Sequence, residues 1–400
     1  MPGPADWFVA GADMAEIRGT TSAAFEAVRT AFAANFDEHG DIGAGVAVYH
    51  HGVPVVDLTG GVVERGGERP YDESTLQLVF STTKGAAAVC VARLVDQGRL
   101  DPSAAVADYW PEFAAQGKEA ITVEQLLSHR AGLAAIEPVL SVDDVCAVEP
   151  VVQALAGQAP LWEPDSTHGY HALTYGWLAG ELVRRVDGRT IGTFFAEEVA
   201  APLGLDFWIG LPEAEESRVA PLIAGDPPSE AADIELMLKI AGPGTLGFRA
   251  LFLNGTLFAM GEETPFNTRA VHATEMPAAN GITNAASLAR MYAACIGEVD
   301  GCRLFSADTM ETARRQRSHG PDHVLFMESA FGLGFGRHSE LFNFGGTDGF
   351  GHYGAGGSVG FADPESGLAF GYVMNRMSTG LGSDPRTDSL IAAALAAARS

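Results

Sequence analysis

The fold is organised around one stretch, residues 81–95. It reads Ser-Thr-Thr-Lys-Gly-Ala-Ala-Ala-Val-Cys-Val-Ala-Arg-Leu-Val. The run from Ala86 to Val91 is apolar without interruption, which is typical of a helix buried on all sides. Gly98 is a natural cap for the end of that helix. We therefore predict a buried central helix that opens near Ser81, with the rest of the chain packed around it.

The first residues of this stretch carry chemistry. A serine hydroxyl is a weak nucleophile and needs a base within hydrogen-bond reach. Ser81 and Lys84 are three residues apart, so on a helix both side chains share one face. Burial at that place favours the neutral lysine and lowers its pKa toward the range of a base. The alternative is an exposed capping serine beside a solvated lysine, but the apolar run that follows Lys84 indicates a buried helix. The chain has only three lysines, Lys84, Lys118 and Lys239, so a Ser-x-x-Lys pattern seldom arises by chance.

Strand signals lie at the two ends of the chain, and helical signals lie between them. Residues 43–49 and 53–58 indicate two strands joined at 50–52, and residues 357–361 and 368–373 indicate two more. An amphipathic helix precedes the first pair, with Phe25, Val28, Phe32 and Phe36 at helical spacing, and a helix over 389–398 closes the chain. Between about 100 and 290 the pattern is mostly helical, with a capping box at Thr122–Gln125.

This order predicts an α+β fold. One antiparallel sheet is built from both ends of the chain and flanked by helices, with a mostly helical region inserted. We place the sheet region at residues 1–75 and 290–400. The helical region, residues 76–289, then carries Ser81 and a second candidate, Tyr170.

Tyr170 follows a turn-rich segment, residues 163–169, and lies just before a helix that ends at Asp187 and Gly188. A phenol relays protons between a nucleophile, a lysine and a leaving group if nearby cations lower its pKa. The alternative is a tyrosine that only packs against a helix entrance. We treat His129 and His168 as structural, Trp162 and Trp177 as core residues, and Asn280-Gly281 beside Arg269 as a surface turn.

A glycine-rich segment precedes the last strands. Residues 351–358 read Gly-His-Tyr-Gly-Ala-Gly-Gly-Ser. Small residues let a backbone approach a ligand closely, and N–H groups exposed at a strand edge are able to stabilise an oxyanion. Glycine-rich turns before strands are common, so this segment alone decides nothing.

Composition excludes several classes of partner. The formal net charge of −26 repels polyanions, so we expect neither nucleic acid nor anionic membrane surfaces as partners. No apolar run is long enough to span a membrane, and the first residues lack the pattern of a secretory signal, so we expect a cytoplasmic protein. The four cysteines are far apart and no metal-like spacing occurs, so we expect no metal and no cofactor.

Three motifs in this order resemble the serine β-lactamase and penicillin-recognising superfamily: Ser81-x-x-Lys84, the Tyr170 segment, and His352-Tyr353-Gly354 before a strand. Residues 126–133 resemble the segment that usually follows the nucleophile helix in that family. The resemblance extends from about Asp41 to Arg376. Within the superfamily the chain is most similar to the class C-like family VIII carboxylesterases.

The resemblance implies a role for each motif. Ser81 would be the acylated nucleophile, Lys84 its base partner and Tyr170 the proton relay. The N–H groups of Ser81 and Ala355 would form the oxyanion hole. The segment His352, Tyr353 and Gly354 would contact the substrate.

Two departures from the family pattern affect the expected substrate. Where β-lactamases have Tyr-x-Asn, this chain has Tyr170-His171-Ala172, so the amide that contacts a β-lactam or peptide is missing. Where they have Lys-Thr-Gly, it has His352-Tyr353-Gly354, so a permanent cation is replaced by a mostly neutral imidazole. We therefore expect a carboxylic ester hydrolase that forms an acyl-enzyme with small or medium neutral esters. The alternatives are a β-lactamase, an amidase or peptidase, an acyltransferase, and a catalytically silent binding protein.

Overall fold

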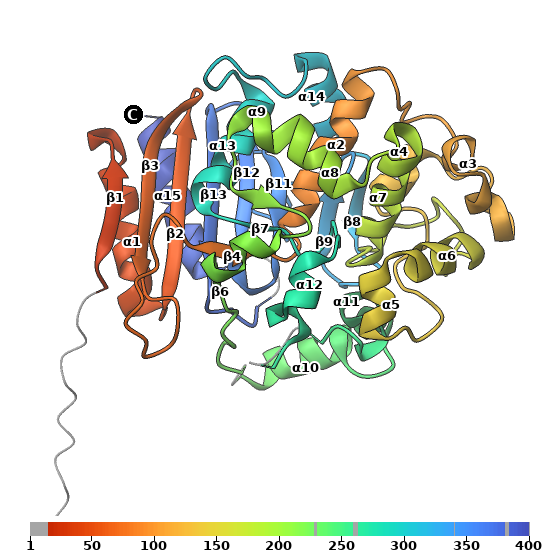
Figure 1. Ribbon diagram of the computed structural model, residues 1–400, viewed down its shortest axis with the longest axis horizontal. Coiled ribbons are helices and arrows are strands. Elements are labelled where there is room, and N and C mark those ends of the chain that lie inside the picture. Colours follow the sequence, from red (N-terminus) through yellow and green to blue (C-terminus); the bar gives the residue numbers. More distant parts are fainter. Residues whose placement is uncertain (1–14, 228–229, 259–262, 340, 381–383, 400) are drawn as a thin grey trace, which may run out of the picture.

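The structure is a computed structural model that describes residues 15–227, 230–258, 263–339, 341–380 and 384–399. Its main sheet has nine antiparallel strands in the order β1-β3-β2-β13-β12-β11-β10-β9-β8 (Figure 1). Strands from the two ends of the chain meet where β2 pairs with β13, with His50 opposite Leu368 and Ala44 opposite Met374. The predicted α+β fold, with a sheet built from both ends of the chain, is confirmed.

The strand bounds follow the sequence in the middle of the sheet and depart from it at one edge. β2, β3, β12 and β13 lie at the predicted places, whereas β1 and the strands β8 to β11 were not predicted, because most of them are only two to four residues long. A second, four-stranded sheet has the order β5-β7-β4-β6. The strands are β1 Ile17–Thr21, β2 Gly43–His50, β3 Val53–Gly61, β4 Leu76–Leu78, β5 Phe207–Trp208, β6 Val219–Ala220, β7 Ile282–Thr283, β8 Ser318–Pro321, β9 Glu328–Phe331, β10 Gly336–Arg337, β11 Phe350–Tyr353, β12 Val359–Asp363 and β13 Leu368–Met374.

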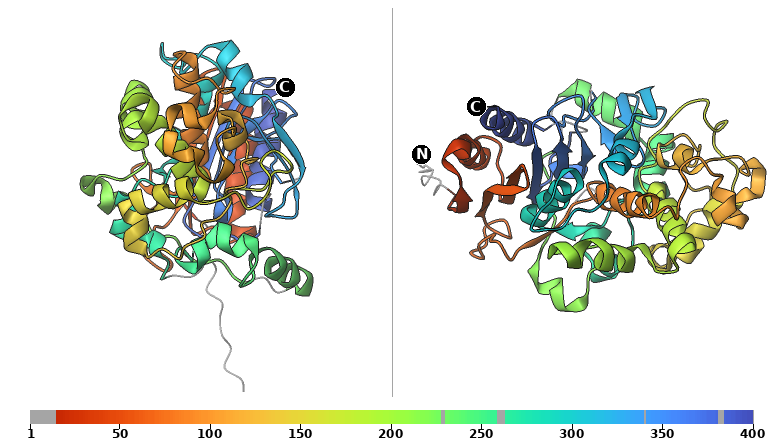
Figure 2. Two further views of the ribbon diagram at one scale, coloured as in Figure 1. Left: turned by 90° about the vertical axis from the view of Figure 1, so that its right-hand side faces the viewer. Right: turned by 90° about the horizontal axis from the view of Figure 1, so that it is seen from above.

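Helices cover both faces of the main sheet. Figure 2 shows helices on both sides of the sheet. Alternate residues of β2 belong to two different cores: Val46 and Val48 pack with α1 and α15, and Ala47 and Tyr49 pack on the side of α13. The helices are α1 Glu26–Glu38, α2 Thr83–Asp96, α3 Val106–Tyr109, α4 Val123–Leu127, α5 Val142–Ala147, α6 Glu149–Gly157, α7 Thr174–Asp187, α8 Ile191–Phe195, α9 Ala201–Leu203, α10 Ala231–Ala241, α11 Leu246–Phe252, α12 Arg269–Ala273, α13 Ala285–Ile296, α14 Ala307–Arg314 and α15 Pro385–Ala398.

The central helix is α2, and it is buried as predicted. Every residue from Thr83 to Ala92 is buried, and the helix packs against α7, α8, α14 and β11. It begins at Thr83, two residues after the predicted opening, so Ser81 lies in the turn that leads into the helix. The capping box of Thr122 and Gln125 at the start of α4 is confirmed, as is the end of α7 at Gly188, which adopts φ +93°.

The division of the chain at residues 75/76 and 289/290 stays a prediction; α13 spans its second boundary. Within the described residues, no single helix is long and apolar enough to cross a membrane. One bent pair, Ile234–Ala241 with Leu246–Gly255, reaches the required length and composition together. The cytoplasmic location also stays a prediction.

Candidate active site

Ser81 is presented by a strained turn between β4 and α2. The residue before it, Phe80, has φ +42°, which a side chain with a Cβ adopts at a cost of about 1–3 kcal/mol. The fold holds this conformation from two sides. The Phe80 ring packs edge-on against Phe266 with centroids 4.8 Å apart, and the Phe80 carbonyl accepts hydrogen bonds from both the N–H and the hydroxyl of Thr83.

Lys84 lies in the first turn of α2 and is completely buried. Its Nζ is 3.0 Å from Ser81 Oγ, 2.6 Å from the Ala172 carbonyl and 3.0 Å from the Ala278 carbonyl. A neutral amine has two N–H donors and one lone pair. The two carbonyls accept both donors, which leaves the lone pair directed at the Ser81 hydroxyl. Burial lowers the pKa of Lys84 well below its ordinary value, so charge and geometry both suit a base.

Tyr170 completes the cluster. Its phenol borders the same cavity as the Ser81 side chain and interacts with it, and Lys84 Nζ lies 4.8 Å from the centroid of its ring. From sequence, a relay role for this phenol depends on nearby cations lowering its pKa. The structure does not meet that condition: burial raises the pKa of Tyr170 and outweighs the opposing effect of the Ser81 side chain. Tyr170 is therefore a protonated phenol in the free protein.

Two residues that flank Tyr170 in space fix its backbone. The buried carboxylate of Asp322 accepts a hydrogen bond of 3.0 Å from the Tyr170 N–H. His129, with φ +64°, accepts from the N–H of Gly169 through its carbonyl and from the N–H of His171 through Nδ1. The structural role expected for His129 therefore includes holding the chain on both sides of Tyr170. Asp322 gave no sequence signal, because a lone Asp in a turn resembles any other.

The glycine-rich segment lies against the turn that carries Ser81. A Cβ added at Gly354 would lie 2.1 Å from the Val79 carbonyl and 2.3 Å from Ser358 Oγ, so only glycine fits there. Ser358 Oγ donates to the Val79 carbonyl at 2.9 Å and lies 3.1 Å from Thr82 Oγ1. These contacts join the turn to the β11–β12 connection, which holds the exposed Ala355 beside Ser81.

The two side chains before Gly354 have different surroundings. The Nδ1–H of His352 donates to the Tyr353 carbonyl at 2.6 Å, and its buried Nε2 has no partner among the described residues. Burial is the main cause that lowers the pKa of His352 to about 3, so this imidazole is neutral. The Tyr353 hydroxyl instead donates to the Asn343 carbonyl at 3.0 Å, and its ring packs against Phe342.

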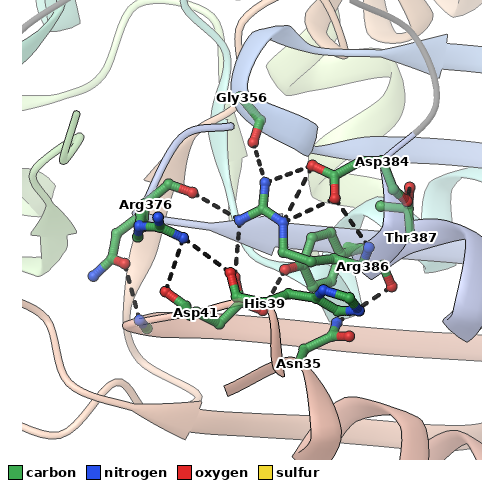
Figure 3. A network of polar contacts seen from close by, with 12 residues as sticks. Asn35, His39, Asp41, Gly356, Arg376, Asp384, Arg386 and Thr387 are labelled. Atoms are coloured by element: carbon green, nitrogen blue, oxygen red, sulfur yellow. Dashed lines mark hydrogen bonds and ion pairs between the residues drawn. The ribbon is translucent and has the colours of Figure 1, made fainter. Parts of the chain in front are cut away.

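A buried arginine supports the Ala355 segment from behind. Figure 3 shows the Arg386 guanidinium between Asp41 and Asp384, with the Gly356 carbonyl on a third side. Its five N–H groups have partners: the two carboxylates and the carbonyls of Gly356 and Arg376. The bond to the Gly356 carbonyl is 2.6 Å long, and Gly356 follows Ala355, whose N–H the family resemblance implies for the oxyanion hole.

The predicted surface turn at Asn280-Gly281 is wrong. Asn280 is completely buried; its side chain accepts from the Met276 N–H and donates to the Val271 and Thr274 carbonyls. The Gly281 N–H donates to Thr83 Oγ1 at 2.8 Å. This segment therefore places the Ala278 carbonyl against Lys84 and stabilises the start of α2. The Asn-Gly pattern alone does not reveal this role.

Two cavities meet at Ser81. The larger, of about 370 Å³, is lined almost entirely by apolar side chains, among them Phe80, Phe266 and residues of α10 and α11. The smaller, of about 90 Å³, is lined by Tyr170, His352, Tyr353 and Gly354. Ser81 and Ala355 border both cavities.

Trp177 lies in the core, as predicted. In the described part of the chain, no group of three or more His, Cys, Asp or Glu side chains is placed to hold a metal ion.

Comparison with known proteins identifies the family. The family model described as Beta-lactamase matches residues 28–395. The chain belongs to the beta-lactamase family. It is therefore a serine hydrolase of that family.

Individual relatives cover nearly the whole chain. The esterase/beta-lactamase LipL of Mycobacterium tuberculosis is 37% identical over 370 residues, which cover 90% of this chain and 83% of the relative. The solved structure of a family VIII carboxylesterase is 38% identical with a TM-score of 0.86, covering 96% of this chain and 100% of that one. A penicillin-binding protein homologue from Caulobacter crescentus is 41% identical with a TM-score of 0.85, at the same coverage of both chains.

Proposed function

We propose that this protein is a carboxylic ester hydrolase that acts on small or medium neutral esters through an acyl-enzyme on Ser81. One observation carries the proposal: the buried Lys84 amine has two carbonyl acceptors and one hydroxyl neighbour, and that hydroxyl belongs to Ser81. Such an amine accepts the Ser81 proton without first having to lose one of its own.

The first half-reaction forms the acyl-enzyme. Ser81 Oγ bonds to the ester carbonyl carbon while its proton moves to Lys84 Nζ. The carbonyl oxygen becomes an anion, and the N–H groups of Ser81 and Ala355 donate to it. The carbon–alkoxy bond then breaks, and the leaving oxygen takes a proton from the Tyr170 phenol. The proton that Lys84 took from Ser81 then returns to the Tyr170 phenolate, which restores both groups.

The second half-reaction repeats these steps with water. Water gives a proton to the Lys84 and Tyr170 pair as its oxygen bonds to the acyl carbon. Collapse of the second tetrahedral anion breaks the bond to Ser81 Oγ, which regains its proton, and the carboxylic acid leaves. The opposite pKa directions of Lys84, lowered, and Tyr170, raised, favour the lysine as the base and the phenol as the donor.

The two cavities suit the two parts of an ester. A leaving alcohol has to lie near the phenol that protonates it, and Tyr170 borders only the smaller cavity. We therefore place the alcohol beside Tyr170 and His352, and the acyl chain in the larger apolar cavity against Phe80 and Phe266. The Ala172 side chain also borders the larger cavity, where it offers no amide to a β-lactam or peptide.

The neutral surroundings separate this proposal from its alternatives. A β-lactamase, amidase or peptidase holds a carboxylate or an amide, but His352 is neutral and Ala172 has no polar side chain. An acyltransferase would follow the same first half-reaction and differ only in the acceptor. A silent binding protein of this fold has no use for a buried lysine whose pKa is lowered well below its ordinary value beside a serine hydroxyl.

The test is intact-mass spectrometry after incubation with a fluorophosphonate, followed by peptide mapping. We expect one adduct on Ser81 and none on Ser81→Ala. A chromogenic acetate ester, a chromogenic cephalosporin and a D-amino-acid amide, assayed side by side, should be hydrolysed in that order of rate. Absence of any adduct on the wild type contradicts the hydrolase, and faster turnover of the cephalosporin or amide contradicts the ester.

A further inference from the structure

The exposed apolar side chains of this protein gather at one place. The described residues include seven large apolar side chains that are exposed, and five of them lie on or near α10. This helix lies at the lower edge of the molecule in Figure 1. Ile234, Leu236 and Leu238 belong to α10 itself. Phe326 lies against Lys239 of α10, with Nζ 5.3 Å from its ring centroid, and Phe258 packs on Phe252 of α11. We call Ile234, Leu236, Leu238, Phe258 and Phe326 the apolar rim.

The apolar rim is continuous with the cavity that leads to Ser81. Leu238 and Phe258 are 55% and 46% exposed, and both also line the larger cavity. A single exposed apolar residue is ordinary in a soluble protein, but a cluster that opens into an apolar cavity marks a binding surface. The route from solvent to the nucleophile therefore begins on an apolar surface.

We propose that the apolar rim docks on the surface of an aggregated, uncharged ester, from which the acyl chain enters the larger cavity. This inference rests on the proposed ester hydrolase function and names the physical form of its substrate. Water-insoluble esters present an apolar surface at their boundary with water, and burial of the rim against that surface is favourable. The bent pair of α10 and α11 is apolar enough in composition to enter such a boundary.

The position of the apolar rim and the net charge of the protein favour an uncharged ester surface over other partners. A second protein copy seated on the rim would cover Leu238 and Phe258 and close the cavity mouth, whereas an ester surface delivers substrate there. The net charge of −26 opposes docking on an anionic membrane, so an uncharged surface is the one that remains.

The experiment compares monomeric and aggregated forms of one substrate, tributyrin, below and above its solubility limit. The variant is Ile234→Ser with Leu236→Ser, because neither residue lines the cavity. The matched control is Val53→Ser at the start of β3, which is 60% exposed and does not belong to the apolar rim. Hydrolysis of water-soluble p-nitrophenyl acetate serves as the reference for an intact active site.

We expect the wild type and Val53→Ser to turn over tributyrin at least tenfold faster above the solubility limit, and to co-sediment with the emulsion. The double variant should lose that increase and the co-sedimentation, while its rate on p-nitrophenyl acetate stays within twofold. The inference is overturned if the wild type shows no increase, or if the double variant keeps it.

Two other outcomes are distinguishable. If light scattering shows that the wild type is a dimer and the double variant a monomer, the rim is a contact between copies and the docking inference is wrong. If the wild type hydrolyses neither substrate and takes no fluorophosphonate, the proposed function fails before the rim is tested.

Discussion

Two buried basic side chains of this protein, Lys84 and Arg386, are held in opposite ways. Arg386 lies between the carboxylates of Asp41 and Asp384, and each of its five N–H groups has an acceptor. Burial acts to lower the pKa of Arg386, but Tyr372 and the two carboxylates outweigh it and the pKa is raised. Lys84 has no such counter-charge among the described residues, and burial alone lowers its pKa. The basic side chain with a structural role is fully paired, whereas the one that we propose transfers protons is left without a counter-ion.

A comparison of Lys118 with Lys84 shows a similar difference between two lysines. Lys118 is also completely buried, and burial lowers its pKa. Its Nζ donates to the Ala115, Ala156 and Gln158 carbonyls. Three carbonyls use all three donors of an ammonium, so a neutral Lys118 would leave one acceptor unsatisfied. Only at Lys84 is the third neighbour a hydroxyl, which is itself a donor.

The largest expected effect separates these two lysines. Lys84→Met should lower kcat/KM for a soluble ester by about 10³-fold or more, because the amine that accepts the Ser81 proton is gone. Lys118→Met should change kcat/KM less than threefold and lower the Tm, because it leaves buried carbonyls without donors. Steady-state kinetics and thermal unfolding of both variants check this. Equal losses of activity would remove the distinction.

The next effect is on stability and concerns Arg386. Arg386→Met leaves Asp41 and Asp384 buried without a counter-charge, which should lower the free energy of unfolding by about 3–5 kcal/mol. Urea unfolding measures this, and the Arg29→Met variant, whose ion pair with Glu26 is exposed, is the control with an expected change of about 0–1 kcal/mol. A loss at Arg386 no larger than at Arg29 would show that the network is not a structural clamp.

A smaller effect on rate sharpens the role of the phenol. Tyr170→Phe should lower kcat by about 10²-fold, because the leaving alcohol loses its proton donor. Tyr292→Phe is the matched control: this phenol is also buried, its hydroxyl has no hydrogen-bond partner among the described residues, and it borders neither cavity at Ser81. Its kcat should stay within threefold. If both variants lose activity equally, the effect of Tyr170 is packing and not proton transfer.

The pH dependence of kcat/KM tests the comparison between Lys84 and Lys118 without a large change in structure. Lowering the pKa of Lys84 makes the amine neutral at pH values where an ordinary lysine is charged, so kcat/KM should rise with pH and become flat well below pH 10.5. Below that pKa the rate should fall up to tenfold per pH unit. His352 and His171, with pKa values of about 3 and about 4, stay neutral across this range. Lys118→Met should leave the profile unchanged; a profile that moves with it would point to the wrong lysine.

Local sequence patterns determined much of the fold. The uninterrupted apolar run after Lys84 predicted the buried helix α2, and strand patterns near both ends predicted a sheet that joins them. The three motifs predicted the side chains that meet in space, because each lies at the start or end of a regular element. Short strands such as β10, with two residues, leave no periodic signal and were missed.

Features that depend on distant contacts were not predictable. Asp322 holds Tyr170 from 152 positions away, and nothing in its own segment distinguishes it from a turn residue. The direction of the Tyr170 pKa shift could not be predicted from the sequence, because burial depends on everything that packs around the phenol. Asn280 failed for the same reason: the Asn-Gly pattern describes a local turn and carries no information on burial.

Direct titration of the three lysines tests the central claim, which is that Lys84 is a neutral amine in the free enzyme. With only Lys84, Lys118 and Lys239 in the chain, carbon-13 labelling of the lysine ε-carbons gives three NMR signals. Single substitutions assign them. We predict that the Lys84 signal titrates well below pH 10.5 and already has the neutral shift at the pH of full activity. A Lys84 signal that keeps the chemical shift of a protonated amine over the whole pH range of activity would contradict the account.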